Sequence, residues 1–373
     1  MLALGCSADA DPDDAREPRP PIVWTGEHLE LGTERSLDEV CAGTLPWADR
    51  FVGYVGDVFG NPDAFVSSYW IDEDIERYCT LDVDCAIGDE AFSRNVVNSH
   101  ELVHASRMTQ MPHRALEEGI AELYGGAVLG TYPLEGDAES LLREHGGGAL
   151  LPAELYGRAG HFASFLRFAY GEQTLVDLRA ASSWEDDWSQ TQATFMEVFG
   201  VPLAEVVATY ELFYPDMCDG SQFRDTNFDC QGDFVTLPSE AGAAPVVIEQ
   251  DLACSDDEVF GLADGARRRT FRLRVEHSAM YHLRMDTRGT AATWRISGRP
   301  CDQSCMNIGP EPDFGRADFV FAANEGDDWP RTLFCFPAGD YEIVVSTTAS
   351  AEQSPRFSLW LEYVGQDDEC EVR

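Results

Sequence analysis

The chain has 373 residues, 44% of them hydrophobic and 25% charged, which is enough for a packed core and for two or three domains. Its 26 basic residues, all of them arginine, stand against 67 acidic residues and give a net charge of −41. Because phosphate groups bind to positive charge, this balance argues against nucleic acid or an anionic membrane as a partner. The acidic excess is typical of a solvated surface.

Eleven cysteines are more than a cytosolic chain of this length usually carries. One of them, Cys6, lies alone near the start of the sequence. The other ten are even in number and predict up to five disulfides in a protein exported to an oxidising environment. They are Cys41, Cys79, Cys85, Cys218, Cys230, Cys254, Cys301, Cys305, Cys335 and Cys370.

The segment Ala3-Leu4-Gly5-Cys6 resembles a bacterial lipobox, in which the cysteine receives a lipid after cleavage in front of it. The residues before it lack the positive and apolar regions of a signal peptide, so either the gene start is set too far downstream or the likeness is accidental. We expect residues 1–21 to be a lipobox-like start and a disordered tether. No apolar run reaches about 18 residues. We therefore expect a cell-surface or outer-membrane lipoprotein attached only through Cys6, or a secreted protein.

Residues 22–213 mix short strand patterns with longer helical ones, which indicates an α+β domain. A helix is predicted from Ser36 to Phe59, with Ser36 as the N-cap of a capping box that includes Glu39. Strands are predicted over residues 27–33 and 64–70, with an edge strand over 86–93. Helical spacing of apolar residues predicts further helices over residues 95–110, 114–129, 137–144, 153–170, 172–180 and 188–213.

Residues 214–244 contain two cysteines and many polar residues, and we interpret them as a disulfide-containing linker. The Asp-rich run 219–229 could hold calcium, but it lacks the alternation and the final Glu of an EF-hand loop, which favours a solvated connection.

From 245 to 373 the pattern becomes period two and predicts an all-β sandwich. The strands are expected over residues 270–275, 281–285, 292–296, 341–345 and 357–364, separated by turn residues. This region resembles the β-sandwich modules that follow bacterial secreted peptidases. Binding of carbohydrate or cell wall by the sandwich is an open alternative to a purely structural role.

The segment His100-Glu101-Leu102-Val103-His104 carries the strongest chemical signal in the chain. Residues four apart on a helix project from one face, so His100 and His104 can hold one metal ion together. Glu101 lies about 100° further round the helix, where it can take a proton from a water on that ion as general base. The expected ion is Zn²⁺, which lowers the pKa of its water to about 7. A surface helix with two incidental histidines is the competing interpretation, and the apolar flanks argue against it.

A zinc site needs a third protein ligand and an open fourth position. The next predicted helix carries Leu116-Glu117-Glu118-Gly119-Ile120-Ala121. Here the chain resembles the gluzincins, the thermolysin and aminopeptidase branch of the zincins, in which a Glu before a Gly supplies the third ligand. The resemblance implies a zincin-like catalytic domain with a small mixed sheet, and it makes Glu118 the ligand. Glu117 and Glu122 are the alternatives, and Glu122 could instead support a ligand histidine.

A second likeness to the gluzincins lies at Tyr156, which stands before a predicted long helix. In the aminopeptidase kind, a Tyr at this place donates a hydrogen bond to the oxyanion, so the resemblance gives Tyr156 that role. Packing of Tyr156 between helices is the plain alternative, and His161 is a second candidate donor. The exopeptidase motif Gly-x-Met-x-Asn has no counterpart before the zinc helix, where the edge strand over 86–93 stands, which favours cleavage within a chain.

We therefore expect an exported zinc metallopeptidase, an endopeptidase acting on a peptide or protein substrate. One alternative is a surface lipoprotein whose inactive zincin domain serves binding or adhesion, although an inactive site would not need Glu101. The other is a zinc hydrolase that acts on a substrate other than a peptide.

Overall fold

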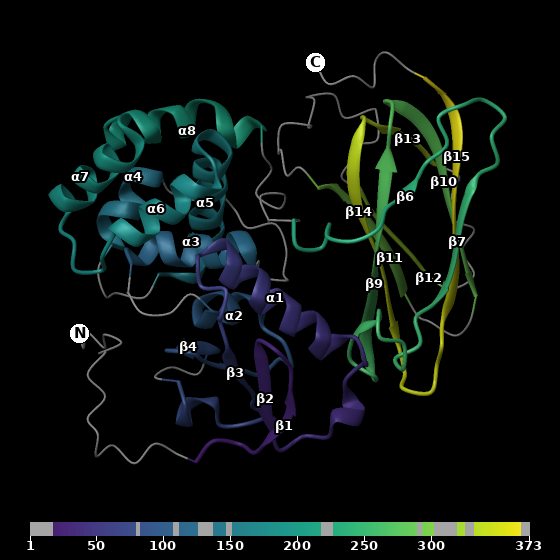
Figure 1. Ribbon diagram of the computed structural model, residues 1–373, viewed down its shortest axis with the longest axis horizontal. Helices are drawn as coiled ribbons and strands as arrows, with labels where there is room; N and C mark the ends of the chain where they lie inside the picture. Colours follow the sequence, from purple (N-terminus) through teal and green to yellow (C-terminus); the bar gives the residue numbers. More distant parts are fainter. Residues whose placement is uncertain are drawn as a thin grey trace. The chain divides into compact units, whose positions relative to one another are not determined.

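The computed structural model describes residues 18–79, 83–106, 112–125, 137–146, 151–217, 227–288, 293–301, 319–324 and 332–366. The chain divides into two compact units (Figure 1). The first falls within Met1–Arg35 and Ala48–Asp225, and the second within Ser36–Trp47 and Thr226–Arg373. The sequence-based division did not assign Ser36–Trp47 to the C-terminal unit. The lipobox-like Cys6 lies outside the described residues.

The first unit is built on a five-stranded mixed sheet in the order β1-β2-β3-β5-β4. Its three central strands run parallel, and the two outer strands are antiparallel to their neighbours. The segment predicted as one edge strand over 86–93 is a hairpin that turns at Gly88, where φ is 65°. The strands are β1 (Ile22–Thr25), β2 (Leu29–Thr33), β3 (Val66–Trp70), β4 (Cys85–Ile87) and β5 (Glu90–Ser93).

Helices make up most of the rest of the described part of this unit, and those predicted between residues 95 and 180 are present with somewhat different bounds. The predicted helix over 188–213 is instead two helices, because Gly200 ends the first with φ at 72° and Pro202 follows. The helices are α1 (Thr44–Val58), α2 (Ser99–Ser106), α3 (Arg114–Tyr124), α4 (Ala138–Glu144), α5 (Tyr156–Tyr170), α6 (Glu172–Ala181), α7 (Trp188–Phe199) and α8 (Leu203–Met217). The short 3₁₀ turns η2 (Ile75–Arg77) and η3 (Ala153–Leu155) also belong to this unit. The turn η1 (Leu37–Glu39) and the first residues of α1 fall in the segment Ser36–Trp47, which is assigned to the second unit.

None of the described helices is by itself long and apolar enough to span a bilayer. The pair α7 and α8 reaches that composition only when joined across a 75° bend.

The helix predicted from Ser36 begins eight residues later, at Thr44. Ser36 does act as an N-cap, but its side chain accepts from the Asp38 amide and caps the short turn η1. The chain is then extended, and Cys41 forms a disulfide with Cys254. Contacts with distant residues of the second unit therefore override the local helical pattern here.

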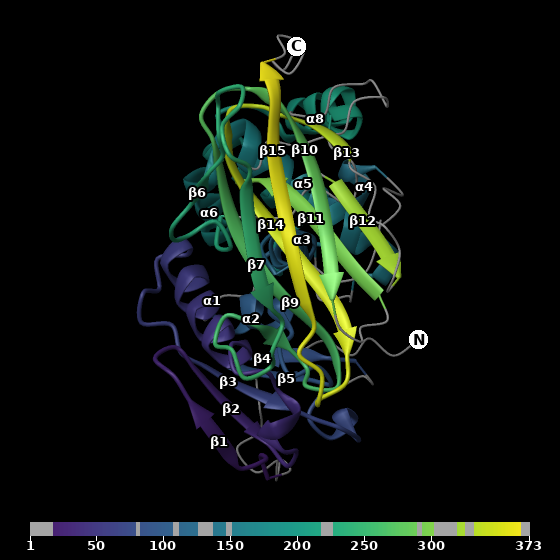
Figure 2. The ribbon, with the colours of Figure 1, turned by 90° about the vertical axis from the view of Figure 1, so that its right-hand side faces the viewer.

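The second unit is almost entirely strands, in two sheets that Figure 2 shows face-on. One sheet has the order β13-β10-β15-β7, and the other has β12-β11-β14-β9-β6 with β8 beside β9. The strands are β6 (Val235–Thr236), β7 (Val246–Asp251), β8 (Phe260–Gly261), β9 (Gly265–Val275), β10 (Ala279–Arg288), β11 (Thr293–Pro300), β12 (Phe319–Asn324), β13 (Thr332–Phe336), β14 (Gly339–Ala349) and β15 (Arg356–Gln366).

One core joins the two sheets into a sandwich. Leu283 and Leu359 of the first sheet pack in the same buried cluster as Trp294 and Ile343 of the second. Disulfides, which the cysteine content predicts, are present. Those between described residues are Cys41–Cys254, Cys79–Cys85 and Cys230–Cys301, and Cys335 is also disulfide-bonded.

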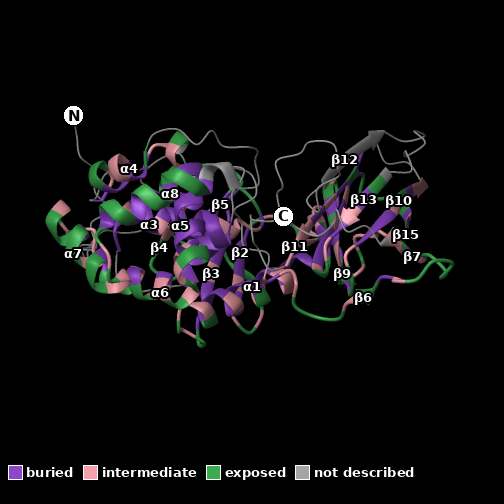
Figure 3. Cartoon of the chain, turned by 90° about the horizontal axis from the view of Figure 1, so that it is seen from above, coloured by how far each residue is buried: buried purple, intermediate pink, exposed green. Residues whose placement is uncertain are grey.

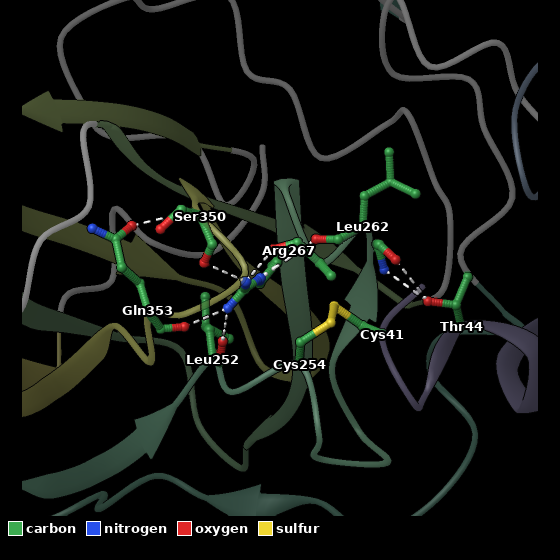
Figure 4. Close-up of a disulfide and its surroundings, with 10 residues drawn as sticks. Cys41, Thr44, Leu252, Cys254, Leu262, Arg267, Ser350 and Gln353 are labelled. Carbon is green, nitrogen blue, oxygen red and sulfur yellow. Dashed lines mark hydrogen bonds between the residues drawn. A yellow bond between two sulfur atoms is a disulfide. The ribbon is translucent and has the colours of Figure 1, made fainter. Parts of the chain in front are cut away.

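A fully buried arginine closes one end of the sandwich (Figure 4). Arg267 stands near the start of β9, and each of its five guanidinium N–H groups has a backbone carbonyl to donate to. The acceptors are the carbonyls of Leu252, Leu262, Ala263, Ser350 and Gln353, all in turns between strands. One side chain thus fixes three loops, close to the Cys41–Cys254 disulfide.

Candidate metal centre

Two glycines let the helices around His100 come close together. A Cβ on Gly125, just after α3, would lie 2.5 Å from the Ser99 carbonyl oxygen at the start of α2. A Cβ on Gly119, within α3, would lie 2.4 Å from the Ala159 carbonyl oxygen in α5. The Gly of the Glu-Gly-Ile-Ala motif is therefore required by helix packing. Figure 3 shows α3 and α5 coloured mostly as buried.

The structure brings the three predicted metal ligands together. The Nε2 atoms of His100 and His104 lie 3.1 Å apart, and the Glu118 Oε2 atom lies 3.1 Å from the first and 3.2 Å from the second. A tetrahedral ion with bonds of about 2.0–2.1 Å holds its ligand atoms about 3.3–3.4 Å apart. The triangle therefore has the size that such an ion requires, and this group could bind a metal ion.

Two further carboxylates lie close to the Nδ1 atoms of the histidines. The Nδ1 atom of His100 lies 3.1 Å from Glu122 Oε1, and the Nδ1 atom of His104 lies 3.1 Å from Glu117 Oε1. We assign the proton of the neutral His104 ring to Nδ1, because its hydrogen-bond partner there, a carboxylate, only accepts. At His100 the Glu122 carboxylate is close to Nδ1 but forms no hydrogen bond with it. When both Nε2 atoms are unprotonated, their lone pairs and the Glu118 oxygen face a common centre. Such a centre favours a cation.

Two arginines that no sequence pattern singled out contact carboxylates of this cluster. Arg114 lies 2.7 Å from Glu118 Oε1 and thereby leaves Oε2 for the centre. Arg179 donates from Nε to Glu117 Oε2 at 3.2 Å. The i,i+4 spacing of Arg114 and Glu118 could have predicted their ion pair, because residues four apart lie on one face of a helix. No local pattern links Arg179 to Glu117, because 62 residues separate them.

The cluster stabilises positive charge on the histidines. Burial lowers the pKa of His100, but its close contacts with the Glu118 and Glu122 carboxylates outweigh burial and raise the pKa to about 10. Burial raises the pKa of Glu118, yet the charges of the two histidines hold it well below its usual range. A metal ion at the centre would displace the ring protons, so its binding should release protons and weaken in acid.

The candidate base and the candidate oxyanion donor both lie by this centre. Glu101 is buried, and burial raises the pKa of its carboxyl group toward the range that suits a general base. The Tyr156 ring contacts the His100 ring edge to face, with centroids 5.7 Å apart, and burial raises the pKa of its hydroxyl. His161 is fully buried, and its Nδ1 lies 2.8 Å from the Tyr210 hydroxyl of α8. Tyr156 is thus the better-placed donor.

A buried neutral histidine precedes the helix that carries Glu118, and it predicts acid sensitivity. His113 Nε2 lies 2.9 Å from the Leu142 carbonyl, and burial lowers the pKa of His113 to about 4. An unfolded histidine has a pKa of about 6.5, so the stabilising effect is complete above that pH and is lost as the pH falls toward 4. The loss is about 3 kcal/mol.

Urea unfolding with excess chelator at pH 7 and pH 4.5 checks this prediction. The variant His113→Gln keeps a donor for the Leu142 carbonyl but does not titrate. We expect the wild type to lose more unfolding free energy between the two pH values than the variant does. An equal loss in both proteins would show that His113 is not the acid-sensitive group.

Comparisons with known proteins leave the family open. No protein-family model and no curated protein matches the chain. Among solved structures, TmCBM61 in complex with β-1,4-galactotriose is similar at 10% identity and a TM-score of 0.19, over 32% of this chain and 70% of that one. BtGH115A, a 4-O-methyl-α-glucuronidase with specificity for decorated arabinogalactans, is similar at 11% identity and a TM-score of 0.20, over 61% of this chain and 32% of that one. Likenesses this slight support no conclusion about fold or function.

Proposed function

We propose that the chain is a zinc-dependent metallopeptidase of gluzincin type in which His100, His104 and Glu118 hold the ion. One observation carries the proposal: three metal-ligating atoms from two helices lie 3.1–3.2 Å apart, with a buried Glu101 beside them. A merely structural zinc site is usually closed by four protein ligands. Only three candidate ligands gather here among the described residues, which leaves a position for water or substrate.

Bound Zn²⁺ would supply Lewis acidity toward a carbonyl group and toward water. Glu101 accepts the proton of the attacking water and delivers it to the leaving amine, which its raised pKa favours. Tyr156 keeps its proton at neutral pH because burial raises its pKa, so it can donate to the substrate oxygen as negative charge develops. Glu122 and Glu117 hold the two imidazoles in the orientation that the ion needs.

A peptide substrate is supported by the edge of the first sheet. The strand β4 ends the described sheet and packs beside α2, the helix that carries both histidines. An extended peptide can add to such an edge through backbone hydrogen bonds without using its termini. We therefore propose cleavage within chains. Disulfides support an exported protein, either secreted or lipid-anchored at Cys6.

A digest of a proteome-derived peptide library tests the proposed function. Zinc-loaded protein should cut peptides at internal bonds, a chelator should stop the cleavage, and added Zn²⁺ should restore it. If no peptide is cut although zinc is bound, a non-peptide hydrolase or a binding protein becomes the better proposal. If the wild type binds no zinc, the metal centre itself is wrong.

Removing the Tyr156 hydroxyl should slow turnover more than it weakens substrate binding. We expect Tyr156→Phe to lower kcat about 10²-fold with little change in KM, because the hydrogen bond strengthens only as the oxyanion forms. Steady-state kinetics on one peptide from the library would measure this effect. The variant Tyr170→Phe, at the far end of the same helix, is the matched control. Equal kinetics for both variants would assign Tyr156 to packing alone.

A further inference from the structure

The metal centre is connected to a residue of α6 through a chain of side-chain contacts. Arg179 donates from Nε to one oxygen of Glu117, at 3.2 Å, and the other oxygen of Glu117 lies 3.1 Å from His104 Nδ1. The contacts use different oxygens, so Glu117 can make both at once. They join helices α6, α3 and α2 in the order arginine, glutamate, histidine.

The arginine is held in a fixed place. Its side chain is 12% exposed and that of Glu117 is 13% exposed, so solvent screens the pair only weakly. The guanidinium also lies over the Phe59 ring, 5.6 Å from its centroid. An arginine fixed on two sides restricts the carboxylate that it contacts.

We propose that Arg179 is a positioning residue for the metal centre, acting through Glu117 on His104. This inference rests on the metal-binding part of the proposed function. Glu117 precedes the ligand Glu118 and lies in a cluster of carboxylates that includes Glu122. Arg179 offsets its charge and holds it against the His104 ring, which keeps the proton on Nδ1 and aims the Nε2 lone pair at the ion. Without Arg179, Glu117 can turn away, and the His104 ring loses its orientation.

We call the contacts from Arg179 through Glu117 to His104 the relay. Metal affinity measured on the full chain tests it directly. Zinc binding by Arg179→Met, measured by competition with a chelator of known affinity, should be about tenfold weaker than in the wild type. The visible spectrum of the Co²⁺-loaded variant should also change, because the His104 ligand is no longer held in one orientation. Arg143→Met is the matched control, since Arg143 pairs with Glu139 on the exposed face of α4. Its zinc affinity should equal that of the wild type.

A double variant distinguishes a relay from a general loss of structure. Glu117→Ala should weaken zinc binding about 10- to 100-fold, and adding Arg179→Met to it should cause no further loss. If Arg179→Met weakens binding by the same factor with and without Glu117, or does not weaken it at all, the relay is wrong. If the wild type binds no zinc, both this inference and the proposed function fail.

Unfolding of the metal-free variants in excess chelator shows whether each one folds. Should Arg179→Met not fold, Arg179→Lys takes its place, because lysine keeps a cationic donor but not the planar fork. A weakening that disappears in the Glu117→Ala background supports the relay. A weakening that persists there overturns it.

Discussion

Replacing Glu101 by Gln is expected to lower peptide hydrolysis by about 10²–10⁴-fold while the bound zinc is retained. Gln has nearly the same shape but cannot accept a proton from water, so only the chemical step is affected. The position is buried and lies beside the metal-ligating atoms without being one of them. Peptide cleavage and zinc content should be measured on the same protein samples.

The matched control is Glu139→Gln, which removes an exposed carboxylate on α4 of the same unit. Its cleavage rate should equal that of the wild type. If Glu101→Gln cleaves as fast as the wild type, Glu101 is not the base. If the variant also loses zinc, Glu101 has a role in metal binding that its placement does not suggest.

Replacing Arg267 by Met is expected to destabilise the β-sandwich by about 3–5 kcal/mol. Met fills part of the volume but donates no hydrogen bond. Five backbone carbonyls at one end of the sandwich would then lose their donor (Figure 4). The buried Trp294 of the sandwich core contributes to the fluorescence signal. Urea unfolding of the full chain, followed by tryptophan fluorescence, would measure the loss.

Arg274→Met is the control for Arg267, because it removes an arginine from the same strand. Arg274 is 47% exposed and pairs with Asp340 on the surface, so its loss should cost less than about 1 kcal/mol. Equal destabilisation by the two variants would mean that the carbonyl contacts of Arg267 add no stability beyond that of a surface ion pair.

The grouping of the candidate metal-binding residues could be predicted in part because their geometry is local. His100 and His104 share one helical face through their spacing, and the resemblance of the Glu-Gly pair in the next helix to the gluzincins implied Glu118. Glu122 could be predicted as a partner of a ligand histidine for the same reason, and it lies 3.1 Å from His100 Nδ1. Spacing alone could not choose between the roles of Glu117 and Glu118. Only the packing of α2 on α3 decides which carboxylate points to the centre.

Sequence by itself determined what depends on short separations along the chain: the helical His-Glu-x-x-His segment, the helix after it, and the period-two strands of the C-terminal unit. Tertiary structure alone decided what depends on distant partners. Helix α1 begins at Thr44 and not at Ser36, because Cys41 before it is bonded to the distant Cys254. The burial of Arg267 among loop carbonyls and the contact of Arg179 with Glu117 also depend on the tertiary fold. Local sequence patterns reflect secondary-structure propensity, whereas these contacts depend on which residues distant in the sequence pack together in the folded chain.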